Sequence, residues 1–440
     1  MNDSSPSLPA KQPHWSQATF RALRHRNFQL FFGGQFISLI GTWMQTIAQT
    51  WLVYRLTGSS LLLGVVGFSS QIPIFLLAPV GGLVADRWNR QKVVIATQSA
   101  SMVLAFILAG LALSRHLTVW EIIVLAAGLG VVNAFDIPAR QAFLVEMVTR
   151  DDLMNAVALN SSMFNGARVA GPAIAGILVA TLGVGWCFFA NAVSYIAVII
   201  GLMLMRIETP TELEENDSAI ENVIEGFRFV RRTGPVWALL LLVGLVSFVA
   251  MPVTVLMPIF ADRILHGGVE GLGWLMGATG VGALLGALAL ATRREVRGLG
   301  RWVFISAAWF GVSLVLFGYS RWMWISIAVL VPSGFFMMVD MAATNTLLQA
   351  MAPDRLRGRV MAVYSMMTGG MAPLGALSAG AAAAHIGAPL TLALGGVACV
   401  IGALWFWRHW PGLRESAREL LVASGMMTRE SADEVAATGD

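Results

Sequence analysis

The residues of this chain that could carry chemistry are polar and charged side chains set inside long apolar segments. Arg168 is the one arginine in the middle of such a segment. A guanidinium in apolar surroundings needs an anionic partner or a water-filled cavity. We therefore expect Arg168 either to contact an anion or a substrate in a central cavity, or to form a structural ion pair with a neighbouring helix. Both roles concern recognition or stability, and neither is catalysis.

A polar stripe runs along the first apolar segment. Its members recur at intervals of three, four, three and four residues, which places them on one helical face: Gln35, Ser38, Thr42, Gln45 and Gln49. A polar face of a helix in an apolar medium must contact protein or water. We predict that this face lines the pathway of a polar solute. The alternative is hydrogen bonding between helices without contact to a substrate.

Two further groups of residues belong to the candidate site. Methionines gather in two late segments, at Met337, Met338, Met341, Met366, Met367 and Met371. Because methionine is flexible and polarizable, we expect both groups, Met337 and Met341 foremost, to line an adaptable apolar wall, the alternative being plain core filling. Asp136 and Asp340 lie toward the ends of two other segments. Each could be half of an ion pair or the carrier of a proton.

The sequence lacks the marks of an enzyme or of an ATP-driven pump. Its two lysines, Lys11 and Lys92, follow alanine and glutamine, so neither completes the Gly-Lys-Ser/Thr of a phosphate-binding loop. No group of His, Cys and carboxylates has the spacing of a metal site. Cys187 and Cys399 lie in apolar runs and suggest no disulfide framework. We expect no catalysis, no cofactor and no metal.

The composition requires a membrane as solvent. The chain has 440 residues, of which 57% are hydrophobic and 12% are charged, about half the charged share of a soluble protein. Twelve apolar stretches approach or exceed the roughly 20 residues that a spanning helix needs, at 28–54, 60–84, 93–113, 117–137, 153–182, 184–206, 236–262, 270–291, 302–319, 323–349, 359–384 and 387–408. The predicted fold is an all-α membrane protein with twelve transmembrane helices.

The basic residues predict the orientation of the chain. Twelve spans place both termini on one side, and that side holds 24 of the 29 Lys and Arg residues, against four in the opposite loops. Loops rich in Lys and Arg stay in the cytoplasm. We therefore expect both termini to be cytoplasmic in a cell (inner) membrane protein. Because the basic charge orients the chain, nucleic acid is not expected as a partner.

The spans divide into two halves. The predicted organisation is a cytoplasmic N-tail, a six-helix bundle, a cytoplasmic linker with an amphipathic helix, a second six-helix bundle and a cytoplasmic C-tail, at 1–26, 27–206, 207–235, 236–410 and 411–440. The halves look weakly repeated, because an offset of 204 residues superposes Asp136 on Asp340 and Leu144 on Leu348. Two pseudo-symmetric bundles are typical of a transporter with alternating access.

The loop after the second span carries the most specific motif. It reads Gly82-Leu-Val-Ala-Asp86-Arg87-Trp-Asn89-Arg90-Gln-Lys92 and resembles the loop 2–3 signature of the major facilitator superfamily. The resemblance implies a latch that closes one conformation, with Gly82 and Arg87 as part of its loop. In that latch Asp86 would cap the helix that begins near Arg357.

The same resemblance assigns the ion pairs of the latch. It implies that Arg90 pairs with Asp136. By the repeat, Asp340 would pair with Arg294, which lies 204 residues after Arg90. For both aspartates the alternative remains a proton site.

The fifth span and a late loop resemble one branch of this superfamily. Gly171-Pro172 is similar to the helix 5 motif of its exporters, where Gly and Pro let helices approach and bend at a moving interface. The run 353–360 resembles the branch that holds enterobactin and macrolide exporters. This implies a secondary active transporter that exports a small amphipathic molecule, of the drug or siderophore class, by proton-coupled alternating access. An importer or a lysolipid flippase on the same scaffold is the alternative.

The expected partners are a small-molecule substrate, the lipid bilayer and a proton as coupling ion, and the chain is expected to be monomeric. Drug/proton antiporters of the superfamily often carry an arginine four residues before a glycine on helix 4, where this chain has Val124 before Gly128. The first span carries amides and hydroxyls but no acid. The residue that carries the proton is therefore unassigned.

Overall fold

The computed structural model describes residues 20–206, 219–292 and 298–423, and these ranges fold almost entirely into α-helices. Six helices make up the N-terminal half: α2 (Arg26–Thr57), α3 (Ser60–Arg87), α4 (Arg90–Leu113), α5 (Val119–Leu144), α6 (Leu153–Thr181) and α7 (Val184–Met203). Six make up the C-terminal half: α9 (Gly234–Ile259), α10 (Gly268–Ala291), α11 (Leu299–Tyr319), α12 (Met323–Met351), α13 (Asp354–Ile386) and α14 (Ala388–Ala423). Between the halves lies α8 (Ala219–Arg232), and short turns occur at η1 (Arg21–Arg24), η2 (Arg150–Asp152) and η3 (Phe260–Ile264).

Local chemistry sets the ends of these helices. The Ser59 side chain caps α3 by accepting a hydrogen bond from the Leu62 backbone N–H at 3.3 Å. The Asn89 side chain caps α4 in the same way, by accepting a hydrogen bond from the Lys92 backbone N–H at 2.9 Å. The helix α2 ends at Gly58, whose φ of 60° is left-handed and suits a residue without Cβ. Loops of a few residues then connect helices that must lie side by side, which favours compact bundles.

Eleven of the described helices are long and apolar enough to cross a membrane. The helix α2 is not one of these eleven, although its 32 residues exceed the bilayer thickness. We attribute the difference to its polar stripe, which lowers its hydropathy. Because α2 packs inside the N-terminal half against α6 and α7, the prediction of an all-α membrane protein with twelve transmembrane helices is confirmed.

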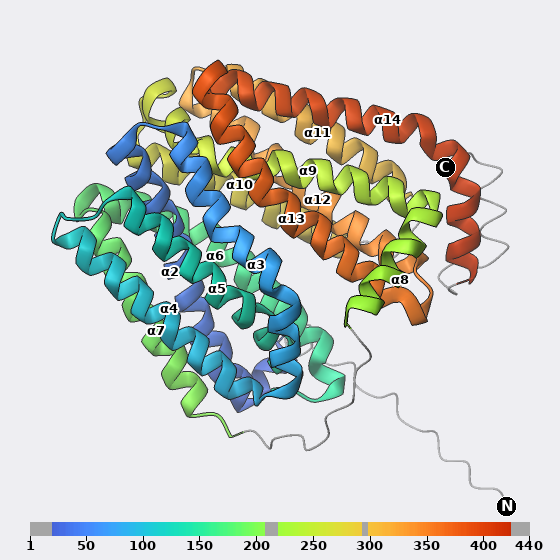
Figure 1. Cartoon of the computed structure of the whole chain (residues 1–440), viewed down its shortest axis with the longest axis horizontal. Helices are drawn as coiled ribbons and strands as arrows, with labels where there is room; N and C mark the ends of the chain where they lie inside the picture. Colours follow the sequence, from blue (N-terminus) through green and yellow to red (C-terminus); the bar gives the residue numbers. More distant parts are fainter. Residues whose placement is uncertain (1–19, 207–218, 293–297, 424–440) are drawn as a thin grey trace, which may run out of the picture.

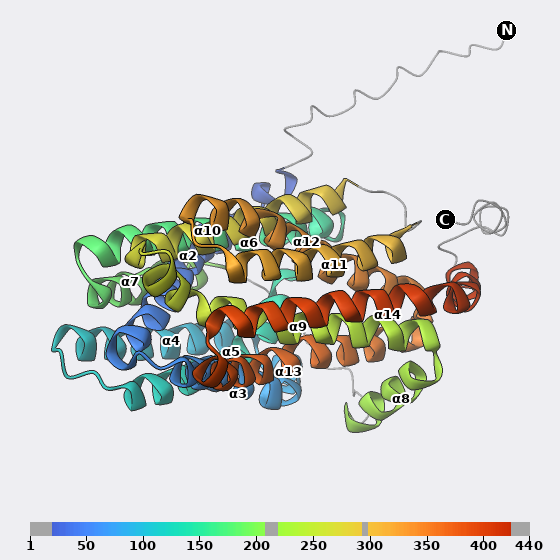
Figure 2. The same cartoon turned by 90° about the horizontal axis from the view of Figure 1, so that it is seen from above.

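The twelve helices form two bundles that touch along two seams. Within the N-terminal half α3 packs on α5 and α2 on α7, and within the C-terminal half α10 packs on α12 and α11 on α14. Between the halves, α3 packs on α13 and α6 on α10. Figure 2 shows the first seam along one side of the molecule and the second along the other.

The two ends of the molecule differ. Figure 1 shows the halves close together where α2 leads into α3, and further apart where α8 lies. We call these the closed end and the open end. At the closed end a Cβ on Gly64 of α3 would lie only 2.6 Å from the Ala376 carbonyl oxygen of α13. Such an approach needs glycine, since any side chain would separate the two helices.

The predicted amphipathic helix of the linker corresponds to α8. It packs against α13, where the Glu225 carboxylate forms ion pairs with Arg359 and, at 3.7 Å, with Arg355. Most of the predicted N-tail, the linker residues 207–218 and the end of the C-tail lie outside the described residues. The helix α8 thus ties the linker to the start of α13 at the open end.

Candidate functional site

The closed end is held by contacts between α2 and the π-helical turn η3. The Tyr54 hydroxyl donates a hydrogen bond to Asp262 Oδ2 at 2.8 Å. The Arg263 guanidinium lies over the Tyr54 ring, 5.6 Å from its centroid. Tyr54 belongs to the N-terminal half and the two charged residues to the other half. These contacts must therefore break before the closed end can open.

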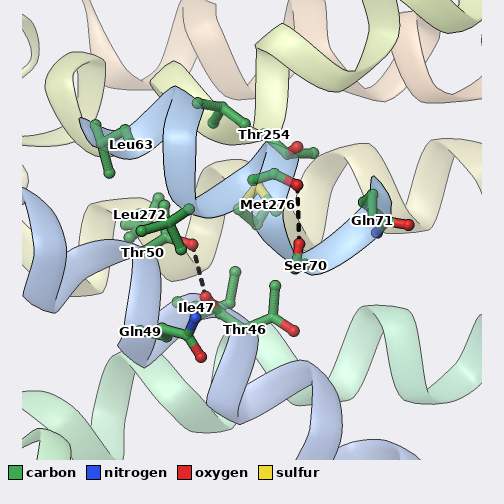
Figure 3. A pocket seen from close by; sticks show the side chains of 13 residues that line it. Thr46, Ile47, Gln49, Thr50, Leu63, Ser70, Gln71, Thr254, Leu272 and Met276 are labelled. Carbon is green, nitrogen blue, oxygen red and sulfur yellow. Dashed lines mark hydrogen bonds between the residues drawn. The ribbon is translucent and has the colours of Figure 1, made fainter. Parts of the chain in front are cut away.

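A polar cavity of about 140 Å³ lies between the halves, bordered by α2, α3, α9 and α10. Its polar lining consists of Thr46, Gln49, Thr50, Ser70, Gln71 and Thr254. Figure 3 shows these side chains with Leu272 and Met276 of the C-terminal half. None of the described residues that line the cavity is charged. It is therefore suited to polar groups that exchange hydrogen bonds with amides and hydroxyls.

The hydrogen bonds drawn in Figure 3 show which groups of this polar cavity are free to bind a ligand. The hydroxyls of Thr50 and Ser70 donate to the carbonyl oxygens of Thr46 and Gly67 on their own helices, at 2.7 and 2.9 Å. Within the described part of the chain, the side-chain amides of Gln49 and Gln71 make no hydrogen bond. An amide has two donors and a carbonyl acceptor, so these two glutamines are the best placed binding groups.

An apolar pocket of about 500 Å³ lies further along α3, where α3, α8 and α13 meet. Its walls are Ile72, Phe75, Phe227, Val363, Met366, Met367, Gly370, Met371 and Leu374. Gln71 and Ile72 are neighbours in sequence, and one lines the polar cavity while the other lines the apolar pocket. The two sites are therefore adjacent along α3.

Arg168 lies at the second seam between the halves. Its guanidinium is 5.7 Å from the centroid of the Trp43 ring on α2, and its backbone oxygen is approached by Gly280 of α10. It forms no salt bridge with any described acidic residue. The structural ion pair that we considered for Arg168 is thus not found in these ranges. A cation over an aromatic ring keeps its charge available to an anionic ligand.

In this conformation most members of the polar stripe of the first span do not line the polar cavity. Gln35, Ser38 and Gln45 are buried, and the Gln45 side-chain oxygen accepts a hydrogen bond from Asn191 of α7 at 2.7 Å. Thr42 bonds the Ser38 carbonyl oxygen of its own helix. The alternative of hydrogen bonding between helices therefore describes this part of the stripe.

The cavity is lined by the adjacent face of α2. Of the stripe, only Gln49 lines it, together with Thr46 and Thr50. The face is displaced because Gly41 lets α7 approach closely: a Cβ at Gly41 would lie 2.5 Å from Asn191 Oδ1. Gly41 falls between Ser38 and Gln45 on the stripe, so α7 covers that face. The positions of the glycines along α2 were a signal in the sequence for which face of α2 is covered by α7.

Of the two groups of methionines considered for the apolar wall, the group on α13 lines the apolar pocket and the group on α12 does not. Met337 is 8% exposed within the packed core, and Met341 packs against the same core. Neither lines the polar cavity or the apolar pocket. The methionines of α13 do so instead, because α13 faces α3 across the seam whereas α12 packs inside its own half against α10 and α11.

The predicted ion pair between Arg90 and Asp136 is not formed. Arg90 pairs instead with Glu146, at 2.8 Å between Nη1 and Oε1, and bonds the Ala85 carbonyl oxygen at the end of α3. Glu146 follows α5 at the level of the loop, whereas Asp136 lies ten residues earlier, or about 15 Å deeper along a helix. The Arg90–Asp136 pair was predicted for a conformation with this end closed, and for that conformation it stays a prediction.

Asp136 is satisfied inside the N-terminal half. Its carboxylate accepts hydrogen bonds from Thr97 and Gln98 of α4, both at 2.8 Å, and lies 3.3 Å from Arg140 Nε. It is 3% exposed. The cluster joins α4 to α5 and has the character of a structural ion pair, which is the reading that we expected for this residue with a different partner.

The remaining latch residues show no contact across the open end with the residues that the structure describes. Asp86 and Arg87 are exposed, and a Cβ at Gly82 would meet nothing within 4 Å. The latch therefore stays a prediction for a conformation in which this end is closed. Asp340 is fully buried, and its predicted partner Arg294 lies outside the described residues.

The Gly171-Pro172 motif lies between two packing surfaces of α6. Gly171 meets Trp43 and Ile40 of α2, and Pro172 faces the other half, where its carbonyl oxygen would be 2.8 Å from a Cβ on Gly273 of α10. Sequence reasoning missed the glycines of α10 on this seam, Gly273, Gly277 and Gly280. Their spacing of four and three residues is the small-residue pattern of close helix pairs.

The comparisons with known proteins agree with this architecture. Residues 17–436 match the major facilitator family described as "transmembrane secretion effector". The chain belongs to the major facilitator superfamily. A staphyloferrin A transporter of Staphylococcus aureus is 26% identical over 86% of this chain and 94% of its own length. The multidrug efflux pump Tap of Mycolicibacterium fortuitum is 28% identical (77% and 85%), and the enterobactin exporter EntS of Shigella boydii is 29% identical (81% and 86%).

A solved facilitator structure has the same fold. A bacterial homologue of the lysosomal transporter Spinster, in an inward-facing and occupied conformation, superposes with a TM-score of 0.69 at 12% identity, over 94% of this chain and 99% of that one. This facilitator-superfamily chain is therefore a multi-span membrane transporter of small molecules and not an enzyme. The described residues hold no group of His, Cys, Asp and Glu that could bind a metal ion.

Proposed function

We propose that the chain exports small amphipathic molecules, of the drug or siderophore class, across the inner membrane in exchange for protons. The observation that carries this proposal is the pair of adjacent sites between the halves. One is polar and lined by free amides, and the other is apolar and lined by methionines. Only a ligand with a polar head and an apolar body uses both.

The sizes of the two sites fit this class of ligand. Small-molecule pockets measure about 300–1,000 Å³ and combine apolar walls with a few polar groups. The apolar pocket of about 500 Å³ lies in that range, and the polar cavity of about 140 Å³ extends it toward the closed end. Arg168, with no acidic partner in the described ranges, adds a positive charge at the second seam. Arg168 lines neither site, so the amides and hydroxyls of the polar cavity favour any head group that exchanges hydrogen bonds.

The orientation and the relatives support export as the direction of transport. If the basic residues place both termini in the cytoplasm, the open end faces the cytoplasm, and this conformation is ready to receive substrate from inside. The relatives with an efflux pump or an exporter in their names support export. Transport would proceed by closing the latch around Asp86 while the Tyr54–Asp262 contact opens.

The experiment is transport in everted membrane vesicles, with ethidium and enterobactin as probes, with and without a proton gradient. We expect uptake of at least one probe into the vesicles, and loss of that uptake when the gradient is collapsed. Gln49→Leu and Gln71→Leu should change the ratio of the two uptake rates. Gln45→Leu is the matched control, because Gln45 bonds Asn191 inside one half; it should lower stability without changing the ratio.

The opposite results would contradict the proposal. Movement of the probe only out of everted vesicles, with no uptake into them, would indicate an importer. A lysolipid flippase is the second candidate, because the apolar pocket has the volume and lining for an acyl chain. Transfer of a fluorescent lysolipid between leaflets, without movement of either probe, would favour that candidate.

A further inference from the structure

The two halves treat equivalent aspartates differently. The offset of 204 residues places Asp136 of α5 on Asp340 of α12, and Arg140 on Thr344. Asp136 thus has an arginine one turn away at 3.3 Å. Asp340 has a threonine at the same place. The repeat therefore keeps the carboxylate in both halves but keeps its counter-charge in only one.

Asp340 is buried without a partner. Its exposure is 0%, and neither carboxylate oxygen accepts a hydrogen bond from any described residue. The Thr344 hydroxyl, on the same face of α12, is also buried and unbonded. Burying a lone carboxylate costs far more free energy than burying the neutral acid. The site therefore accommodates Asp340 with a proton bound.

The surroundings supply no compensating charge. The ionisable groups near Asp340 are the Tyr364 phenol on α13 and the Cys399 thiol on α14. Of the other helices packed on α12, α9 has no ionisable side chain, α10 has only Glu270 in its first turn, and α11 has only Arg301 and Tyr319 near its two ends. No cation among the described residues pairs with Asp340.

Polar groups lead from Asp340 toward the open end. The Tyr364 hydroxyl donates to the carbonyl oxygen of Met341, the residue after Asp340, at 3.2 Å. Asn345 lies within reach of the same hydroxyl. The side chain of Gln349, which is exposed, donates to Asn345 Oδ1 at 2.6 Å. The neighbourhood of Asp340 is therefore polar on the side of the open end, where the aqueous phase is nearest.

We propose that Asp340 is the group that binds and releases the coupling proton of the transport cycle. The proposal rests on the proposed exchange of substrate for protons and names its carrier. Protonation converts the Asp340 carboxylate to the carboxylic acid, and deprotonation returns the same proton to water at the open end. No other bond forms or breaks. Asp136 cannot serve in this way, because its charge is held by Arg140.

The test uses the purified full chain in proteoliposomes with ethidium as probe, comparing wild type with Asp340→Asn. Two modes are measured: accumulation driven by a pH gradient, and exchange of labelled for unlabelled ethidium without a gradient. We expect Asp340→Asn to lose accumulation, with the ethidium concentration ratio falling to one, while exchange continues within twofold of wild type. Asp340→Glu should restore part of the accumulation. Unchanged gradient-driven accumulation in Asp340→Asn would overturn the proposal.

A second readout does not depend on transport. Infrared spectroscopy of the wild type at neutral pH should show the carbonyl band of a protonated carboxylic acid, and Asp340→Asn should lack that band. Absence of the band from the wild type would overturn the proposal. Failure of the wild type to move ethidium or enterobactin in either mode would contradict the proposed function, while the infrared band would still decide the protonation of Asp340.

Discussion

Replacing Tyr54 with phenylalanine should release the closed end. The substitution removes the hydroxyl that donates to Asp262 at 2.8 Å and leaves the ring beneath Arg263 in place. A hydrogen bond to a charged group is worth about 1.5–3 kcal/mol. Because this bond joins the two halves only while the closed end is closed, its loss should shift the conformational equilibrium by roughly 10- to 150-fold.

Double electron–electron resonance, which gives the distances between two spin labels at the open end, would measure that shift. Trp88→Cys directly after α3 and Gly358→Cys on α13 are suitable label sites, since Trp88 is 69% exposed and a Cβ at Gly358 would meet nothing within 4 Å. The native cysteines are buried and should not react. We expect Tyr54→Phe to increase the population with a short distance between the labels.

The control for this measurement is Tyr319→Phe. Tyr319 ends α11, is 59% exposed and belongs to a helix that packs on α12 and α14 of its own half. It should leave the distance distribution unchanged. If Tyr54→Phe also gave the wild-type distribution, the Tyr54–Asp262 contact would not hold the closed end, and our account of that gate would be refuted.

Three further substitutions test the seams and the buried charges. Gly273→Leu should reduce transport at least tenfold without loss of membrane insertion, since its Cβ would lie 2.8 Å from the Pro172 carbonyl oxygen. Gly277→Ala should transport at nearly the wild-type rate, because its Cβ would lie 4.0 Å from the Val169 carbonyl oxygen. Asp136→Asn should lower the free energy of unfolding by about 3 kcal/mol, measured by thermal unfolding in detergent, because it leaves the Arg140 guanidinium without a counter-charge. Arg168→Gln should leave the melting temperature unchanged, because Arg168 has no acidic partner among the described residues. It should lower the transport rate of anionic probes more than that of cationic probes. A fall in melting temperature would reveal a structural role.

Sequence alone was sufficient for the helices and their division into halves. Apolar runs of bilayer length have no other stable conformation in lipid, because every backbone group must be bonded within the segment. The linker helix α8 was also visible from its amphipathic pattern. Even 302–319, the shortest of the twelve stretches, corresponds to a complete helix, α11.

The candidate site was only partly predictable. The regular spacing of the polar residues on α2, Gln45 among them, showed that this face of the helix must avoid lipid. Both a cavity and a neighbouring helix satisfy that requirement. Packing decided between them, since Gly41 brings α7 onto that face. Likewise the loop motif indicated an ion pair for Arg90, and only the depth of Glu146 showed which acid it meets. Sequence periodicity gives the face of a helix, and the neighbour of that face depends on the fold.

The binding site at the centre of this account can be tested through Gln49. In Gln49→Cys the new thiol would line the polar cavity, while Cys187 and Cys399 remain buried and unreactive. We predict that a membrane-impermeant thiol reagent labels this cysteine from the open-end face of oriented vesicles, and from the opposite face once substrate and a proton gradient drive the cycle. Each labelling should be slowed by saturating ethidium or enterobactin. Labelling from one face only under all conditions, or from neither face, would contradict a cavity that opens alternately to the two sides of the membrane.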